Sequence, residues 1–430
     1  MVENWVNWAG NQRAGAAAVL RPASTEQVAA AVREAAGARR TVKPVGSGHS
    51  FTAAAATDGV RLELDRLAGL VGVRGQHVTV QAGMRLRALN RVLAQHGLAL
   101  PNLGDIDAQT VAGALATGTH GTGARYGCLA SFVTGMTLVT GTGEVVTCDR
   151  STDPELFEAA RVGVGAVGVV TEVTLSCVDA FTLYAQERPE RLADVLAGLD
   201  QHVAGNDHFE FYWFPYTDRV LAKRNNRVPV ADRPLPAWRA WLDDSLLSNT
   251  VFGAACRLGR AVPGLVPVLS RVEARALGAR EYTAPSYEVF CTPRRARFVE
   301  MEYGLPRDAL AEALGALRSI VDSLPLRVLF PVEVRFAAGD DVWLSHSCGR
   351  DSAYIAIHQY AGVPYEPYFR AFERVAAGLG GRPHWGKMHW LGVDELRPRY
   401  EHFADFLAVR DRVDPDRVFA NPYTLRIFGP

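Results

Sequence analysis

The sequence predicts an α+β fold made of two structural units, and three observations support this prediction. The chain has 430 residues, more than a single hydrophobic core usually supports. Its first 178 residues alternate helix-like and strand-like patterns that are separated by glycine clusters. Beyond Val178 to Ala180 glycine becomes rarer, and aromatic strand-like runs such as HFEFYWFPY at 208–216 appear. We therefore place a domain boundary near residue 178.

The first unit opens with a helix and continues as mixed structure. Ser24 and Gln27 have the spacing of a capping box in PASTEQVAAAVREAAG, which keeps a helical period as far as Gly37. A second, amphipathic helix is predicted over 84–97. Strands are predicted where apolar and polar side chains alternate, as in GVRLELDRL, HVTVQAG and VGVVTEVTLSCV. MTLVTGTGEVVTCD at 136–149 has the pattern of a hairpin.

The second unit has a less regular pattern. Segment 227–285 contains several Pro and Trp residues, and we interpret it as insertions. Segment 286–391 returns to strand and helix patterns. The tail, FADFLAVRDRVDPDRVFANPY, predicts a helix, a Pro-Asp turn and an Asn-Pro-Tyr end.

The composition argues against several classes of protein. Lys plus Arg and Asp plus Glu number 46 each, so no net charge favours binding to nucleic acid. The six cysteines form no CxxC pair, which argues against a disulfide framework and a zinc knuckle.

No uninterrupted run of about 18 apolar residues predicts a membrane-spanning helix. The stretch at 251–272 could lie on a membrane surface, but its arginines and prolines favour a partly buried helix pair. Met1 to Asn11 lacks the pattern of a secretory leader, and we expect a cytoplasmic protein.

Three glycine clusters lie in the first unit, at 45–48, 116–124 and 163–168. Glycine allows a positive φ and lets a ligand approach backbone N–H groups closely, which is one way in which proteins hold phosphates. A tight turn explains any single cluster equally well. Three clusters in one unit favour a large nucleotide cofactor.

Familiar site patterns do not fit. His49, Ser50 and Phe51 follow Gly-Ser-Gly, so the third glycine of a dinucleotide fingerprint is missing. GRPHWGK at 381–387 has the spacing of a P-loop, but Met388 stands where Ser or Thr would hold magnesium. No HExxH motif, close His/Asp cluster or G-x-S-x-G elbow is present, and we predict no metal.

Several long motifs in the same order resemble the aldonolactone and alditol oxidoreductases of the vanillyl-alcohol-oxidase superfamily, which are FAD enzymes. These motifs are VGSGHSF, LPNLGDIDAQTVAGALATGTHGTG, ARVGVGAVGVVTEVTL, PVEVRF, WLSHSCGRDSAYIAI and GRPHWGKMH. The resemblance is strongest to the L-gulono-1,4-lactone oxidase and dehydrogenase branch. It implies an FAD-binding domain at 1–178, an antiparallel-sheet cap domain at 179–408 that binds substrate, and a return to the FAD domain at 409–430.

The resemblance also implies that His49 is joined covalently to the 8α-methyl group of the flavin. A neutral imidazole nitrogen can attack that carbon when it is electrophilic. A histidine that only caps its own turn is the alternative. The full set of residues implied to bind FAD is Val45, Gly46, Ser47, Gly48, His49, Ser50, Gly104, Asp105, Thr117, Gly118, Thr119, His120, Gly121, Thr122, Gly163, Gly168, Val169 and Asn421. For His120 a structural and a catalytic role remain equally open.

Substrate contacts are expected on the strand PVEVRF and on HWGK. Glu333 and Arg335 are two residues apart in a strand and therefore share one face, where they offer an acceptor and a forked donor to a polyhydroxylated substrate. The resemblance assigns these two residues and Lys387 to substrate contact and catalysis. His358 and Asp105 are further substrate-binding candidates.

The stretch LPNLGD separates two possible substrates. Polyol oxidases of the family carry alanine and serine where this chain has Gly104 and Asp105, which favours an aldono-1,4-lactone such as L-gulono-1,4-lactone over an alditol such as xylitol or sorbitol. A small Gly104 near the flavin should give O2 access, so we expect an oxidase that forms H2O2. The alternative from a different functional class is a nucleotide-binding scaffold without redox chemistry. We expect a monomer.

Overall fold

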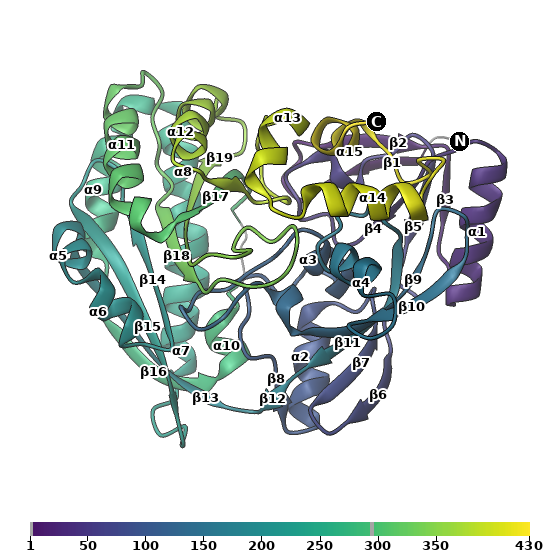
Figure 1. Ribbon diagram of the computed structural model, residues 1–430. Coiled ribbons are helices and arrows are strands. Elements are labelled where there is room, and N and C mark those ends of the chain that lie inside the picture. The colour runs from purple at the N-terminus through teal and green to yellow at the C-terminus, as the bar shows by residue number, and fades with distance from the viewer. Residues whose placement is uncertain (1–2, 293–295) are drawn as a thin grey trace.

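The computed structural model describes residues 3–292 and 296–430. Two small sheets lie near the N-terminus (Figure 1). The first pairs β1 (Glu3–Val6) with β2 (Arg13–Ala16), and the second has the parallel order β3 (Ala18–Leu20), β5 (Val60–Glu63), β4 (Val42–Val45). Helix α1 (Thr25–Gly37) connects β3 to β4, and the Ser24 side chain accepts from the Gln27 N–H as the sequence predicts.

A five-stranded antiparallel sheet completes the N-terminal part. Its order is β10 (Val145–Asp149), β9 (Val133–Val139), β11 (Val169–Ser176), β7 (His77–Gln81), β6 (Leu70–Arg74). The predicted hairpin at 136–149 is confirmed, because β9 and β10 pair antiparallel. The other elements of this part are η1 (Ala53–Ala55), α2 (Leu86–Gln95), β8 (Leu98–Ala99), α3 (Val111–Ala116), η2 (Leu129–Phe132), α4 (Pro154–Arg161) and β12 (Val178–Asp179).

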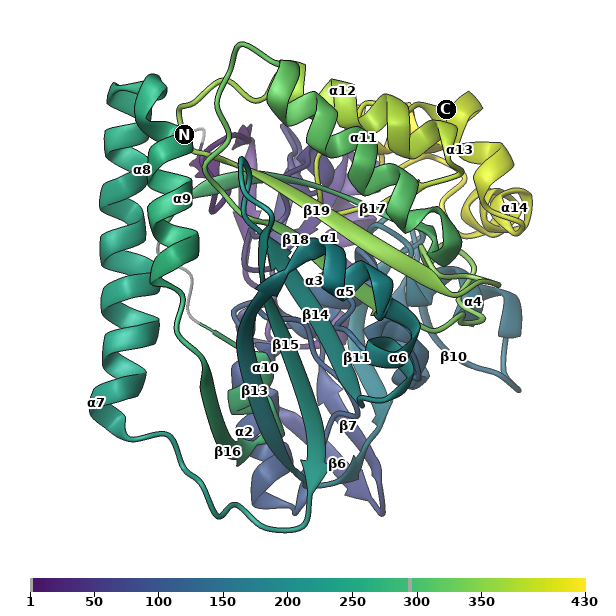
Figure 2. The ribbon, with the colours of Figure 1, turned by 90° about the vertical axis from the view of Figure 1, so that its left-hand side faces the viewer.

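An eight-stranded sheet forms the other half of the molecule (Figures 1 and 2). Its order is β16 (Arg280–Pro285), β13 (Thr182–Arg191), β15 (Arg219–Val228), β14 (His208–Trp213), β18 (Val332–Ala337), β19 (Ser352–Tyr360), β17 (Phe298–Pro306), β20 (Arg382–Pro383). The interpretation of 227–285 as insertions is wrong at its end, because β16 pairs with β13 along its whole length.

This half of the molecule also contains helices. Its helical segments are α5 (Leu192–Ala197), α6 (Leu199–Ala204), α7 (Ala237–Ala240), the π-helix η3 (Trp241–Val251), α8 (Phe252–Ala261), η4 (Pro263–Leu265), α9 (Val266–Ala276), α10 (Ser286–Phe290), η5 (Arg307–Ala309), α11 (Leu310–Ser323) and α12 (Glu366–Gly378). Helices α8 and α9 form the helix pair predicted for 251–272 and stand at one edge of the molecule (Figure 2).

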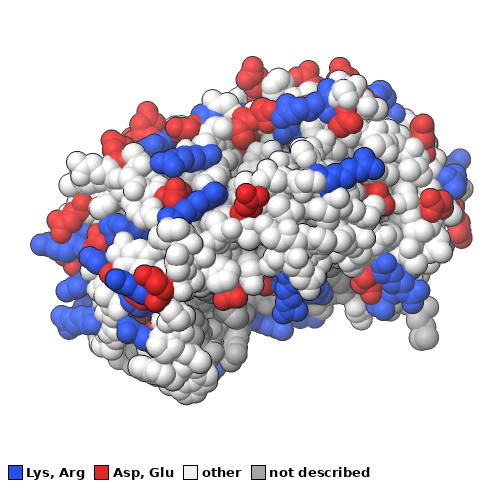
Figure 3. Space-filling view, turned by 90° about the horizontal axis from the view of Figure 1, so that it is seen from below, with Lys and Arg blue, Asp and Glu red and all other residues white. Residues whose placement is uncertain are grey.

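The charge on the surface and the length of the helices are both as the sequence predicts. Basic and acidic side chains are intermingled over the face in Figure 3, and neither sign dominates it. No helix among the described residues is long and apolar enough to cross a membrane.

The C-terminal helices return to the N-terminal part (Figure 1). They are α13 (Val393–Leu396), η6 (Arg397–Arg399), α14 (Phe403–Val413) and α15 (Pro422–Phe428). Asn421 caps α15 by accepting from the Thr424 N–H, while its Nδ2 lies 2.9, 3.1 and 2.9 Å from the carbonyl oxygens of Ala53, Ala54 and Ala56. One buried amide therefore joins the end of the chain to the loop that follows GSGHSF.

Replacing Asn421 with alanine should destabilise the protein by roughly 1–3 kcal/mol, because the change removes a helix cap and leaves buried carbonyl groups without a donor. Urea unfolding of the purified protein measures this loss. The matched control is Gln76→Ala, which removes an exposed side-chain hydrogen bond to Asp179 and should cost far less. Equal midpoints for Asn421→Ala and the wild type would contradict the structural role of Asn421.

Candidate functional site

A cavity of about 370 Å³ lies where the three predicted glycine clusters meet, and we call it the large cavity. Its loops come from β4, the N-terminus of α3 and the segment before β11. Of the predicted cofactor-binding residues, the large cavity is lined by Val45, Gly46, Ser47, Gly48, His49, Ser50, Thr117, Gly163 and Gly168. Residues far apart in the sequence therefore form one wall.

The glycines of these loops are required by close contacts. A Cβ on Gly46 would lie 2.4 Å from Thr110 Oγ1, and one on Gly168 would lie 2.5 Å from a Leu138 methyl group. Within the described chain, the backbone N–H groups of Ser47 and Gly48 find no acceptor. Donors that point from a glycine loop suit an anionic group such as a pyrophosphate.

Lys43 on β4 also lines the large cavity, and sequence reasoning missed it. Burial, opposed by the charge of Asp414, lowers the pKa of Lys43 to about 7. Its Nζ lies 3.3 Å from the Gly165 carbonyl. A lone lysine inside the buried run VKPV is the signal that could have revealed it.

His49 lines both the large cavity and a second space of about 50 Å³, which we call the small chamber. Its imidazole stacks on Trp8 with 5.5 Å between ring centres. Burial and the nearby cations Arg85 and Lys387 lower the pKa of His49 to about 4. The ring is therefore neutral near pH 7 and has a lone pair for nucleophilic attack.

The small chamber lies at the junction of the two halves of the molecule. Its lining is Trp8, His49, Ser50, Phe51, Gly104, Asp105, Ile106, Gln109, Thr117, Thr119, His120, Glu302, Arg335, His384, Gly386 and Lys387. Among the predicted residues, it thus brings together Gly104, Asp105, Thr119, His120, Arg335 and Lys387.

The remaining predicted residues lie elsewhere. Neither lining includes Gly118, Gly121, Thr122, Val169, Glu333, His358 or Asn421. Asn421 supports the loop at 53–56. His358 faces Glu300, with Nε2 3.4 Å from its carboxylate, and its Nδ1 lies 3.2 Å from the Pro331 carbonyl.

Arg335 on β18 is the centre of a buried group of charges. It forms an ion pair with Glu333, and its guanidinium lies 3.0 Å from Glu210 and 3.5 Å from Asp105. Burial alone would lower the pKa of Arg335, but these carboxylates raise it well above its ordinary value. Glu333 also accepts from the Tyr212 hydroxyl at 2.8 Å. Glu333 therefore holds Arg335, as the shared strand face predicts.

Strand β17 contributes two buried carboxylates that sequence reasoning missed. Glu300 forms an ion pair with Lys387, and Glu302 lies 3.9 Å from the same Nζ and 3.1 Å from His120 Nε2. Burial would lower the pKa of Lys387, but Glu300 raises it above its ordinary value. The signal is the same as in PVEVRF: the two glutamates of FVEMEYGL alternate within an otherwise buried strand.

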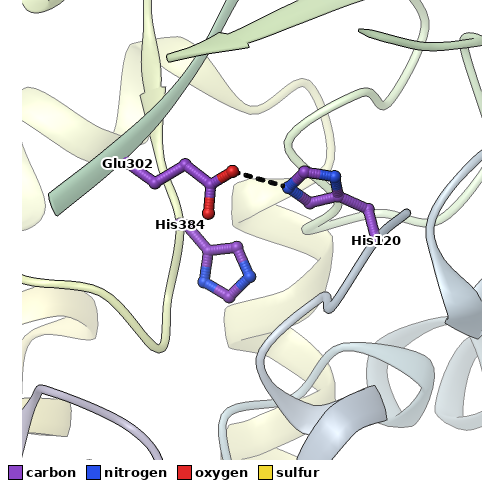
Figure 4. Close-up of side chains that lie close together, drawn as sticks. All are labelled: His120, Glu302 and His384. Atoms are coloured by element: carbon purple, nitrogen blue, oxygen red, sulfur yellow. Dashed lines mark ion pairs between the residues drawn. The ribbon is translucent and has the colours of Figure 1, made fainter. Parts of the chain in front are cut away.

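Three buried side chains that could bind a metal ion lie close together (Figure 4). Ligand atoms of His120, Glu302 and His384 all lie within 4.8 Å of one another. His384 Nδ1 accepts from the Gly386 N–H at 3.0 Å, which places the hydrogen of a neutral ring on Nε2 and leaves no lone pair there for a cation. The hydrogen bonds fit a proton network better than a metal site, and the absence of a metal stays a prediction.

Comparisons with known proteins show the family to which the chain belongs. The family described as D-arabinono-1,4-lactone oxidase matches residues 173–427, and the family described as FAD binding domain matches residues 16–149. The chain is similar to L-gulono-1,4-lactone dehydrogenase of Mycobacterium tuberculosis (strain ATCC 25618 / H37Rv), with 43% identity over 99% of both chains.

More distant relatives are also found. L-gulonolactone oxidase of Bos taurus is 34% identical, covering 98% of this chain and 97% of its own. Alditol oxidase of Streptomyces sp. is 33% identical over 97% of both. The crystal structure of cholesterol oxidase from B. sterolicum has a TM-score of 0.85 at 18% identity and covers 100% of this chain and 97% of its own, which shows a shared fold.

The buried neutral histidines predict a pH-dependent stability. Burial lowers the pKa of His208 to about 4, so between pH 6.5 and about 4 the unfolded chain binds a proton there that the folded chain does not. The free energy of unfolding should therefore fall as the pH falls through this window, by up to about 3 kcal/mol for His208 alone. Urea unfolding at several pH values measures the slope.

His208→Gln should unfold more easily at pH 7 but show a shallower pH slope. His77→Gln, at an exposed position, is the control and should keep the wild-type slope. An unchanged slope in His208→Gln would show that this histidine is not a buried neutral group.

Proposed function

The chain belongs to the D-arabinono-1,4-lactone oxidase family and is an FAD-dependent oxidoreductase, and from this premise we propose that it oxidises an aldono-1,4-lactone such as L-gulono-1,4-lactone. The observation that carries the proposal is the small chamber, because Arg335 and Lys387 line it together with His49, which also lines the large cavity. The higher identity to a lactone dehydrogenase than to an alditol oxidase supports a lactone as substrate.

The domain assignment follows the sheets. We assign residues 1–178 to FAD binding, 179–408 to the substrate cap and 409–430 to a return to the FAD domain. The change from the five-stranded to the eight-stranded sheet between β11 and β13 supports the first boundary. The contact of Asn421 with the loop at 53–56 supports the return.

The residues of the large cavity fit FAD. The backbone N–H groups of Ser47 and Gly48 would hold the pyrophosphate. Lys43 would supply a nearby cation. When bound, the flavin supplies the hydride acceptor. We place a covalent link at His49 Nδ1 or Nε2, because its neutral imidazole lies at the junction of the two spaces.

The side chains of the small chamber would hold the substrate. Arg335 presents a forked donor that Glu333 and Glu210 fix in place, so it can bind the ring oxygen atoms of a lactone. Lys387 and Asp105 would bind hydroxyl groups. His358 would act on the substrate only through Glu300.

We assign O2 as the electron acceptor, with H2O2 as the product. A Cβ on Gly104 would lie 3.2 Å from the His120 carbonyl and 3.3 Å from a Thr119 methyl group. An alanine at this position would therefore fit only if these neighbours moved by a few tenths of an ångström, so glycine keeps this edge of the small chamber uncrowded. We also propose that the enzyme is a monomer, that it is cytoplasmic and that it has no nucleic-acid partner.

Reduction of the flavin under anaerobic conditions tests the substrate. L-Gulono-1,4-lactone should bleach the flavin absorbance, and xylitol or sorbitol should do so far more slowly. Air admitted afterwards should restore the absorbance within seconds. Faster reduction by an alditol would favour the alditol oxidase function, and reoxidation over minutes would exclude O2 as the acceptor. Colourless protein that takes up no FAD would favour a scaffold without redox chemistry.

The covalent link has its own test. Acid-precipitated wild-type protein should stay yellow, whereas His49→Ala should fold, bind FAD and lose the colour to the acid supernatant. His77→Ala is the matched control at an exposed histidine and should stay yellow. Yellow precipitate from His49→Ala would place the link elsewhere.

A further inference from the structure

Oxidation of an alcohol releases a proton as well as a hydride, so the site needs a group that receives the proton. Among the described residues, the carboxylates that line the small chamber are Asp105 and Glu302. Asp105 is a quarter exposed and lies 3.5 Å from the Arg335 guanidinium, which stabilises its charged form. Glu302 is nearly buried and faces an imidazole instead.

The other nearby carboxylates are held by permanent cations. Glu333 and Glu210 are both paired with Arg335, and Glu300 is paired with Lys387. Burial would raise the pKa of Glu300, but the charge of Lys387 is the main cause that lowers it to about 2. In opposition to burial, His120 also lowers the pKa of Glu302, so the two glutamates differ in the partner that holds them and not in the direction of this shift.

Glu302 differs because its nearest partner can gain or lose a proton. His120 Nδ1 lies 2.9 Å from the Gly121 carbonyl, so this nitrogen carries a hydrogen. In the neutral ring, Nε2 then presents a lone pair to a carboxylate oxygen 3.1 Å away. Two acceptors that face each other at this distance repel, and one added proton turns the contact into a strong hydrogen bond.

We propose that Glu302 is the catalytic residue that takes the hydroxyl proton of the substrate, and that His120 is the positioning residue that shares this proton. The inference rests on the proposed function. The hydrogen of the carbinol C–H bond would leave with both electrons, as a hydride for which a bound flavin would supply the acceptor. The O–H bond of the hydroxyl on that carbon would break, its proton would go to Glu302, and its electron pair would form the C=O bond of the product. The proton then lies between Glu302 and His120.

Charged and titratable groups face Glu302 from each element around it. Glu300 lies on the same face of β17, Lys387 and His384 follow β20, and His120 follows α3. Tyr354 of β19 stacks on the His120 ring with 3.6 Å between ring centres. This ring contact and the bond to Gly121 fix the direction of Nε2. Figure 4 shows the His120 ring directed at the Glu302 carboxylate. His384 lies beneath the second carboxylate oxygen.

Glu302→Gln tests the proposal, because glutamine keeps the shape of the side chain but cannot accept the proton. The variant should bind FAD and lactone normally, yet its flavin should be reduced by lactone roughly 100-fold or more slowly in anaerobic stopped flow. The wild-type reduction rate should fall at low pH, because a protonated Glu302 cannot accept another proton. This fall should be absent from Glu302→Gln. A reduction rate within threefold of the wild type, with the low-pH fall retained, would overturn the proposal.

Glu373→Gln is the matched control, because Glu373 is also buried but accepts from Tyr303 and the Trp390 N–H outside the site. It should lose stability without a change in the pH profile. His120→Asn should slow flavin reduction less than Glu302→Gln and displace the low-pH fall. An unchanged pH profile in His120→Asn would remove His120 from the proton path.

A measurement without substrate keeps the proposal testable if the variants fold poorly or the lactone proves wrong. Imidazole 15N spectra of the wild-type holoenzyme, with the His120 signal identified by its loss in His120→Asn, should show hydrogen on Nδ1 at every pH, an unshared Nε2 at high pH, and a proton shared at Nε2 as the pH falls. A neutral ring with an unshared Nε2 throughout pH 5–9 would overturn the proposal. Failure of the lactone to reduce wild-type flavin would instead refute the proposed substrate.

Discussion

The burial of many charges on one face of the eight-stranded sheet is the constraint on which the rest of the structure depends. Each charge is expensive to remove from water and is tolerated only beside a partner. Arg335 therefore needs Glu333 and Glu210, Glu210 lies 3.4 Å from Lys223, and Lys387 needs Glu300. The strands that carry them must keep their register, because a shift by one residue would move each charge into the apolar side of the sheet. The pairing of the buried charges and the register of the sheet therefore depend on each other.

Much of the fold could be predicted because local signals agree with the tertiary structure. The Ser24 helix cap and the hairpin at 136–149 are both present, since each is decided by contacts close in the sequence. Strand β16 was missed because its pairing with β13 joins residues about a hundred positions apart, and nothing in REYTAP alone indicates that partner. The periodicity of a sequence can indicate that a segment is a strand, but it does not indicate the distant strand with which that segment pairs.

The site could be predicted where a motif encodes backbone geometry or a shared strand face. The glycine loops and the Glu333–Arg335 pair are of this kind. Glu302 was missed although the alternation in FVEMEYGL offered the same signal, because its importance appears only when His120 is placed beside it. Asn421 was expected at the cofactor but contacts the loop at 53–56, since the sequence shows that the tail returns and not which backbone groups it meets.

The return of the tail also has a consequence for synthesis of the chain. The loop that follows GSGHSF is held by Asn421, and Phe51 donates its backbone N–H to Gly386. Both partners are made more than 300 residues after the loop itself. The contacts that hold this loop therefore form only after the tail has been made, and a chain truncated before Asn421 would lack one of them.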